Sequence, residues 1–233
     1  MSYKNNFVSV VIVAAGLGKR MKANMNKQYL LLKDKPIVAH TIEKFEKNEY
    51  IDEIIVVTKE EEIEYCRVNV VDRYGFKKIK DIISGGTERQ DSVYNGLKEC
   101  SENTKVVLIH DGVRPFIKNE EINTIIVETL EVGACVTGVR VKDTIKVVND
   151  DNFIIDTPNR KNLWAVHTPQ SFSYKIILDA HVKCKGEGWV VTDDSMLVEK
   201  LGIKVKMIEG SYDNIKITSP EDLYVAENIL DKK

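Results

Sequence analysis

The sequence predicts an α/β fold with a doubly wound, mostly parallel sheet. Short runs rich in β-branched residues alternate along the chain with longer stretches of helical period. Parallel strands joined by crossover helices are buried on both faces, so continuous apolar runs of this kind are typical of them. The length of 233 residues suits a single domain, 1–233. Residues 139–172 depart from the pattern and predict a protruding β-hairpin arm.

The predicted elements of the sheet follow one another without a linker or a repeat. In chain order they are a strand at 8–13, a helix at 37–45, strands at 54–57 and 82–83, a helix at 92–97, a strand at 106–109 and a helix at 122–130. Residues 60–64 hold four glutamates, a charge run that indicates a solvent-exposed helix face.

The arm is predicted from two short alternating segments on either side of a turn. Residues 144–148 and 153–155 alternate apolar with polar side chains, and Asn149-Asp-Asp-Asn152 between them is a turn signal. Because a two-stranded hairpin is marginally stable alone, we expect the arm to pack on a second copy of the chain.

The last helix has the clearest start in the sequence. Ser219 is a suitable N-cap, Pro220 suits the first helical position, and Glu221 and Asp222 face the positive end of the helix dipole. An apolar face follows, made by Leu223, Ala226 and Leu230.

Composition narrows the function classes. The 34 Lys and Arg residues are balanced by 36 Asp and Glu residues, which argues against a nucleic-acid surface. The four scattered cysteines form no metal-ligand spacing and indicate reduced thiols. The polar N-terminus and the lack of a long apolar span indicate neither a signal peptide nor a membrane segment. We therefore expect a cytoplasmic protein that binds neither nucleic acid nor a membrane.

A glycine loop follows the first predicted strand. In Val11-Ile-Val-Ala-Ala-Gly-Leu-Gly-Lys-Arg-Met21 the third glycine of a dinucleotide fingerprint is missing, and so is the Ser or Thr of a Walker loop. Glycines at a strand end still let backbone N–H groups approach an anion, and Lys19, Arg20 and Lys27 add positive charge. The alternative is a plain turn with solvated cations.

Several motifs in order along the chain resemble one family. They are Ala14-Ala-Gly-Leu-Gly-Lys-Arg-Met21, Lys27-Gln-Tyr-Leu30, Gly85-Gly-Thr-Glu-Arg-Gln-Asp-Ser-Val93, His110-Asp-Gly-Val-Arg-Pro-Phe116, Thr168-Pro-Gln170, Thr192-Asp-Asp194 and Asp213-Asn-Ile-Lys-Ile-Thr218. Together they closely resemble the 2-C-methyl-D-erythritol 4-phosphate cytidylyltransferases of the non-mevalonate isoprenoid pathway. The resemblance implies a Rossmann-like nucleotidyltransferase fold and a Mg²⁺-dependent enzyme. Its reaction transfers CMP from CTP to the polyol phosphate, releases pyrophosphate and forms 4-diphosphocytidyl-2-C-methyl-D-erythritol.

The resemblance also assigns residues to the nucleotide. The catalytic role falls to Arg20, Lys27 and Lys216. Arg20 and Lys27 match positions that hold the triphosphate, with Lys27 expected on the α-phosphate, and Lys216 matches a position beside the polyol phosphate. CTP binding falls to Ala14, Ala15, Gly16, Gly18, Gly86, Asp91 and Ser92. A capping box from Thr87 to Gln90 is the structural alternative for the glycine segment.

For the polyol phosphate, the resemblance implies a site built partly by the arm. The expected substrate-binding residues are Asp111, Arg114, Thr144, Arg160, Thr168 and Thr192, and Asp111 is also the expected Mg²⁺ ligand. Thr144 and Arg160 lie on the arm, so the resemblance implies a homodimer in which Arg160 reaches across the interface.

Other functions stay open at this point. Gly112 and Val113 stand where many members of the family have alanines, and relatives that act on ribitol 5-phosphate share the valine, so that polyol is the nearest alternative substrate. A non-catalytic nucleotide-binding protein is a second alternative. A dehydrogenase is disfavoured because the dinucleotide fingerprint fails.

Overall fold

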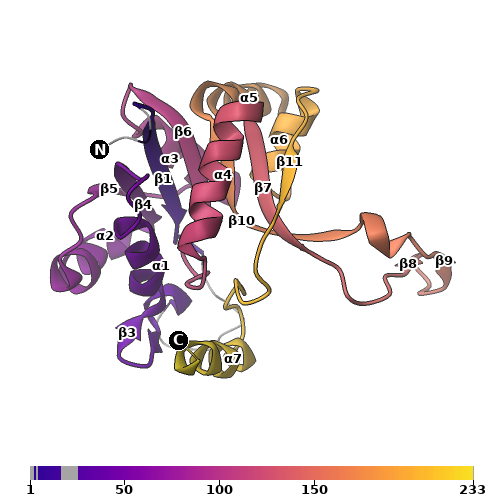
Figure 1. Cartoon of the computed structure of the whole chain (residues 1–233), viewed down its shortest axis with the longest axis horizontal. Helices are drawn as coiled ribbons and strands as arrows, with labels where there is room; N and C mark the ends of the chain where they lie inside the picture. The colour runs from indigo at the N-terminus through magenta and orange to yellow at the C-terminus, as the bar shows by residue number, and fades with distance from the viewer. Residues whose placement is uncertain (1–2, 4, 17–25, 233) are drawn as a thin grey trace.

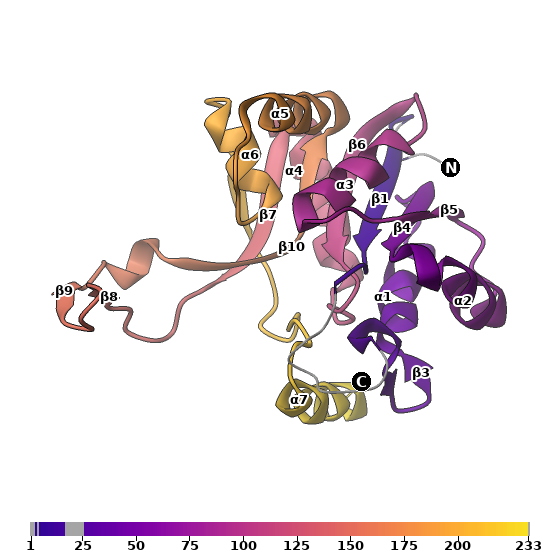
Figure 2. The same cartoon turned by 180° about the vertical axis from the view of Figure 1, so that it is seen from behind.

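A seven-stranded sheet lies between two layers of helices in the computed structural model (Figures 1 and 2), which describes residues 3, 5–16 and 26–232. The strand order is β11 (Lys206–Glu209), β7 (Ala134–Arg140), β10 (Trp164–Ser173), β6 (Thr104–Asp111), β1 (Phe7–Val13), β4 (Glu53–Thr58) and β5 (Ile79–Ser84). β10 runs antiparallel to both neighbours, and every other pairing in this sheet is parallel. The predicted fold class, α/β with a doubly wound and mostly parallel sheet, is confirmed.

In the part of the chain that the structure describes, three helices cover each face of the sheet. In β1 the side chains of Val8, Val10 and Ile12 point to one face and Val11 to the other, as the two-residue period of a strand requires. The first face packs against α1 (Ile37–Glu46), α4 (Asn119–Val132) and α2 (Ile63–Cys66), which continues as a π-helical segment, Arg67–Asp72. The second face packs against α3 (Arg89–Lys98), α5 (Tyr174–Glu187) and α6 (Asp194–Lys200).

A third apolar cluster joins the C-terminal helix to the rest of the structure. α7 (Pro220–Asp231) lies beyond the carboxyl ends of the central strands and packs with the small hairpin of β2 (Leu31–Leu32) and β3 (Lys35–Pro36) (Figure 1). Ser219 caps α7 by accepting a hydrogen bond from the Asp222 amide, as predicted. Among the described residues, no helix has the length and apolarity that crossing a bilayer requires.

The arm stands away from the sheet in both views (Figures 1 and 2). It carries β8 (Val147–Val148), β9 (Ile154–Asp156) and a 3-10 turn, Arg160–Asn162. The two ends of the predicted 139–172 segment belong to the sheet, because Val139 pairs with Ala165 between β7 and β10. The protruding part is therefore residues 141–163.

One local prediction held only in part and another was wrong. Residues 60–64 begin with a 3-10 turn, Glu60–Glu62, and Glu62 is buried although its neighbours Glu60 and Glu61 are exposed. The box at the start of α3 is formed by Glu88 and Asp91 instead of Thr87 and Gln90, since the Asp91 carboxylate accepts a hydrogen bond from the Glu88 amide at 3.1 Å. Both differences arose because charge and spacing along the chain do not show which side chains of a turn face the sheet.

Candidate active site

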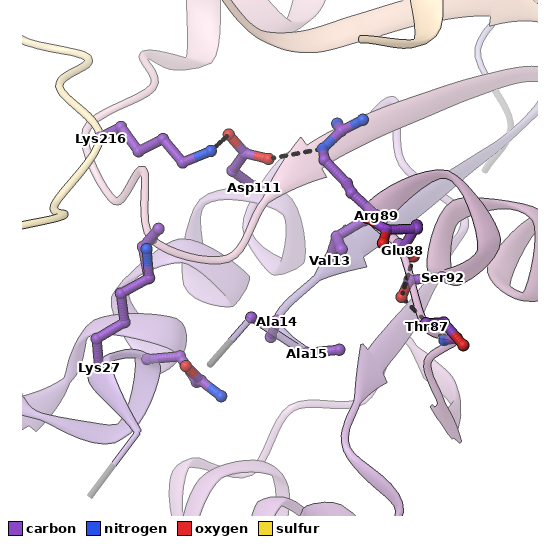
Figure 3. A pocket seen from close by; sticks show the side chains of 14 residues that line it. Val13, Ala14, Ala15, Lys27, Thr87, Glu88, Arg89, Ser92, Asp111 and Lys216 are labelled. Atoms are coloured by element: carbon purple, nitrogen blue, oxygen red, sulfur yellow. Dashed lines mark hydrogen bonds and ion pairs between the residues drawn. The ribbon is translucent and has the colours of Figure 1, made fainter. Parts of the chain in front are cut away.

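A cavity of about 240 Å³ opens at the carboxyl ends of β1 and β6 (Figure 3). The two strands are neighbours, and Val13 at the end of β1 is in register with Asp111 at the end of β6. After β1 the chain adds β4 and β5 on one side of it and then crosses over to form β6 on the other side. The strand order reverses at this point, and open α/β sheets bind ligands at such a topological switch point. The lining comes from residues 13–16, 27–28, 86–89, 92, 111, 113 and 216.

Asp111 is the charged centre of the cavity. Its carboxylate lies 2.8 Å from the Lys216 ammonium and 3.5 Å from both the Arg89 and the Arg114 guanidinium groups. Burial alone would raise the pKa of the Asp111 carboxyl, but the charges of Arg89, Lys216 and Arg114 outweigh burial and hold this pKa well below its usual range. Asp111 is thus a permanent anion that fixes three cations around the cavity.

Arg89, the first residue of α3, links Asp111 to a second buried carboxylate. Its Nη1 donates to Oδ2 of Asp194 at 2.8 Å, and Asp194 is 1% exposed at the start of α6. Asp194 also lies 3.5 Å from Nε2 of His181. The sequence indicated no role for Arg89, although this residue stands inside the Gly85–Val93 motif. Its partner Asp194 is distant in the chain, and no local pattern predicts the pair.

The opposite wall is a tight turn between β5 and α3. Ser92 accepts a hydrogen bond from the Gly86 amide at 3.0 Å and donates one to the Glu88 carbonyl at 3.2 Å. A side chain at position 86 would meet the Asp91 Cβ at 2.3 Å, so only glycine permits this approach. The turn holds backbone groups of residues 86–89 at the cavity edge, where a flat polar base could be read by hydrogen bonds.

The structure brings most of the predicted residues together. The cavity is lined by Ala14, Ala15, Gly16, Lys27, Gly86, Ser92, Asp111 and Lys216. Behind Asp111, Thr168 Oγ1 accepts a hydrogen bond from the Asp111 amide at 3.0 Å, and Arg114 donates to the Asn214 carbonyl at 2.8 Å.

Other predicted residues lie elsewhere. Asp91 does not line the cavity and instead caps α3. Thr192 is exposed just before α6, and Thr144 and Arg160 lie on the arm outside this cavity. The Arg160 guanidinium donates to the Lys142 carbonyl at 2.6 Å. Gly18 and Arg20 fall outside the described residues.

His110 lies directly under the site and is fully buried. Its Nε2 is 3.0 Å from the Arg114 carbonyl, which can only accept, so Nε2 carries the proton of the neutral ring. Nδ1 is buried without a hydrogen-bond partner among the described residues. Burial lowers the pKa of His110 to about 4, because a second proton would place an unpaired charge in the core.

We expect His110 to make the protein less stable in acid. The folded-state pKa lies below that of the unfolded chain, so the stability is intact above about pH 6.5 and is lost as pH falls toward 4, by roughly 3 kcal/mol for this group. Urea unfolding of the wild type and of His110→Gln across pH 4 to 8 measures the difference. The variant should lose less stability over that interval, whereas parallel pH curves would contradict the assignment.

Asp111 offers a divalent cation a carboxylate ligand in this cavity. Among the described residues no group of three or more His, Cys, Asp and Glu side chains is placed to hold a metal. Mg²⁺ is commonly bound by one or two carboxylates together with substrate phosphates, and the Asp111 carboxylate, at the cavity surface beside the cations, fits that mode. Asp111 therefore fits as a ligand that needs the phosphates to complete the site.

Comparison with known proteins agrees with this geometry. The family model of 2-C-methyl-D-erythritol 4-phosphate cytidylyltransferase matches residues 8–232. The chain is 53% identical over 222 residues to the protein of that name from Alkaliphilus oremlandii, covering 95% of this chain and 94% of the relative. It is 52% identical over 222 residues to the one from Clostridioides difficile, covering 95% and 93%.

Solved structures give the same result. The crystal structure of 4-diphosphocytidyl-2C-methyl-D-erythritol synthase from Anaerococcus prevotii superposes with a TM-score of 0.88 at 33% identity, covering 98% of this chain and 97% of the other. The cytidylyltransferase from Francisella tularensis gives a TM-score of 0.79 at 31% identity, covering 95% and 98%. With the cavity at the β1 and β6 ends, these matches show that the chain belongs to the 2-C-methyl-D-erythritol 4-phosphate cytidylyltransferase family.

Proposed function

We propose that the cavity around Asp111 carries out the reaction of this family with the residues described above. The chain is a nucleotidyltransferase that transfers CMP from CTP to 2-C-methyl-D-erythritol 4-phosphate and releases pyrophosphate. The observation that supports these site roles most directly is the set of cations at the switch point. Lys27 and Lys216 lie on one side of the cavity and the Gly86–Ser92 turn on the other (Figure 3).

The chemistry needs charge compensation more than a base. A phosphate monoester has its second pKa near ~6, so its oxygen is already a nucleophile at neutral pH. That oxygen forms a bond to the α-phosphorus of CTP, and the bond to the bridging oxygen breaks as pyrophosphate leaves with the electron pair. Lys27 and Lys216 offset the negative charge that gathers, while the backbone of residues 14–16 and the turn at Gly86 hold the nucleotide.

Mg²⁺ is proposed as the cofactor, with Asp111 as its protein ligand. A bound Mg²⁺ would neutralise phosphate charge and polarise the α-phosphoryl group. Arg89, Arg114 and Lys216 hold the Asp111 carboxylate in one orientation, so its position is set before ligands enter.

The test of this function is pyrophosphate release by the purified chain. CTP and Mg²⁺ are supplied with 2-C-methyl-D-erythritol 4-phosphate in one reaction and ribitol 5-phosphate in another. Release with the first polyol alone is the expected result. Release with ribitol 5-phosphate alone would keep the mechanism and change the substrate, and CTP binding without release under either polyol would favour a non-catalytic nucleotide-binding protein.

The arm supports a homodimer. Its hairpin exposes a run of large apolar side chains, among them Phe153 at 71% exposure, with Ile154 and Ile155 beside it. A two-stranded hairpin with such a surface is marginal in water, so a partner surface is expected to cover it. We propose that the arm packs on a second copy and delivers Thr144 and Arg160 to the polyol phosphate in that copy's cavity, where Thr192, Thr168 and Arg114 surround the same substrate.

Replacing Arg160 is expected to weaken binding of the polyol phosphate. Arginine donates two parallel hydrogen bonds to a phosphate, so Arg160→Ala should raise KM for this substrate by about 10- to 100-fold with the KM for CTP little changed. Initial rates of pyrophosphate release measure both constants. Lys161→Ala, on the exposed neighbouring residue, is the matched control. An unchanged KM for the polyol phosphate in Arg160→Ala would show that Arg160 is a solvent-exposed loop cation without a role in substrate binding.

Mixed dimers test whether Arg160 acts across the interface. Chains carrying Lys27→Ala and chains carrying Arg160→Ala are each defective, but a mixed dimer has one cavity with both residues intact. Random pairing of co-expressed chains should therefore restore about a quarter of wild-type activity. No recovery in mixed dimers would place Arg160 in its own chain's site.

We propose a cytoplasmic location for the protein. All four cysteines are buried as free thiols, and unpaired cysteines are typical of a reducing compartment.

A further inference from the structure

Glu62 is a buried carboxylate next to the cavity that the reaction does not use directly. It follows the carboxyl end of β4, in the Glu60–Glu62 turn, and is 9% exposed. Its Oε2 accepts hydrogen bonds from Gln28 Nε2 at 3.0 Å and from Thr58 Oγ1 at 2.9 Å, and its Oε1 accepts one from Asn26 Nδ2. These donors are two neutral amides and a hydroxyl.

Two of the three donors flank Lys27 in the chain. Asn26 precedes Lys27 and Gln28 follows it, so one carboxylate binds the side chains on both sides of this lysine. Lys27 begins a single 3-10 turn, Lys27–Tyr29, which is too short to hold its own conformation. The hydroxyl of Tyr29, the last residue of that turn, lies 2.8 Å from Thr58 Oγ1. Because the Thr58 hydroxyl donates its proton to Glu62, the Tyr29 hydroxyl is the donor to Thr58. The turn is thus fastened to the end of β4 through Thr58 and Glu62.

The same strand end also supports the opposite wall of the cavity. The Thr58 carbonyl accepts a hydrogen bond from the Gly85 amide at 2.7 Å, and the Val57 carbonyl accepts one from the Ala14 amide at 2.7 Å. The Lys27–Tyr29 turn and the turn that begins at Gly85 are therefore both hydrogen-bonded to the carboxyl end of β4.

Stability alone does not account for Glu62. Burying a carboxylate is costly unless hydrogen bonds compensate, and an apolar side chain with apolar neighbours would serve the core as well or better. What the carboxylate adds is orientation, because two acceptor oxygens fix three donors in one arrangement. We infer that Glu62 is a positioning residue for catalysis, which sets where the Lys27 ammonium lies in the cavity by binding the side chains of both its neighbours.

The test compares Glu62→Met with the wild type in the full chain. This inference rests on the proposed role of Lys27, and misplacing a catalytic group by about 1 Å can cost up to ~100-fold in rate. We expect kcat to fall by about 10- to 100-fold while KM for the polyol phosphate stays within about twofold, because that substrate binds beside Asp111 and the arm. Glu62→Gln should recover part of the rate, since an amide can still accept from two donors if Asn26 turns its own amide. Glu64→Met, at an exposed position of the adjoining helix, is the matched control and should leave the rate unchanged.

A double-variant cycle separates positioning from a general structural role. In a Lys27→Ala background, Glu62→Met should lower kcat by less than about twofold, because the group it positions is already gone. An equal fold-loss in both backgrounds would overturn the inference, and so would a normal kcat in folded Glu62→Met. If Glu62→Met does not fold, as judged by circular dichroism, Asn26→Ala at a half-buried position tests the same cycle. The wild-type assay keeps the two proposals apart, since failure of the proposed function abolishes pyrophosphate release in the wild type itself.

Discussion

Lys27→Ala is expected to reduce kcat by about 100- to 1000-fold, the range seen when one preorganised donor to a transition-state charge is removed. Lys27 lines the cavity, and its ammonium is placed on the same side as Lys216 (Figure 3). Negative charge develops on the departing pyrophosphate as its bond to the α-phosphorus breaks, so a cation there stabilises the transition state more than the bound substrates. The loss should therefore fall on kcat more than on KM for either substrate. Steady-state pyrophosphate release with both substrates varied measures the split.

The matched control for this variant is Lys47→Ala. Lys47 is 72% exposed and pairs with Glu43 on the surface, away from the cavity. Its removal should leave turnover at the wild-type level and stability within about 0.5 kcal/mol. A near-normal kcat for folded Lys27→Ala would exclude the proposed α-phosphate contact.

Arg89→Met is expected to lower the free energy of unfolding by about 1 to 3 kcal/mol, because it leaves the buried Asp194 carboxylate without its partner while Arg89 itself is 31% exposed. Arg89 donates to Asp194, which is 1% exposed. Burial raises the pKa of the Asp194 carboxyl, but the guanidinium outweighs burial and holds this pKa below its usual value. Without Arg89 the Asp194 charge is buried beside His181 alone, and Asp111 loses one of its three cations. Urea unfolding at neutral pH measures the loss.

The double variant Arg89→Met with Asp194→Asn identifies the cause. Asp194→Asn removes the unpaired carboxylate charge, so it should restore part of the stability lost in Arg89→Met. The stability changes of the two single variants should therefore not add up to that of the double variant. Arg67→Met, at an exposed position in the π-helical segment after α2, is the matched control and should change stability by less than about 0.5 kcal/mol. Additive losses in the double variant would show that Arg89 contributes packing and not charge pairing.

The sequence by itself determined the fold class, the predicted strands and the start of the last helix. These follow from local rules: apolar runs buried on both faces, helical period, and the cap formed by Ser219 with Pro220. It also named most of the cavity lining, because Lys27, Gly86, Asp111 and Lys216 each stand at the end of a strand or inside a motif that resembles the family.

Only the tertiary structure decided how charges far apart in the chain are paired. The Arg89 link between Asp111 and Asp194 joins three separate elements, and the burial of Glu62 in a run of exposed glutamates depends on Asn26, Gln28 and Thr58 meeting it at the end of β4. Helical period and charge patterning are properties of neighbours along the chain, whereas these contacts depend on sheet order and on the way the turns pack against it. That dependence is the physical reason the sequence predicted exposure correctly for Glu60, Glu61 and Glu64 but not for Glu62, and indicated no role for Arg89.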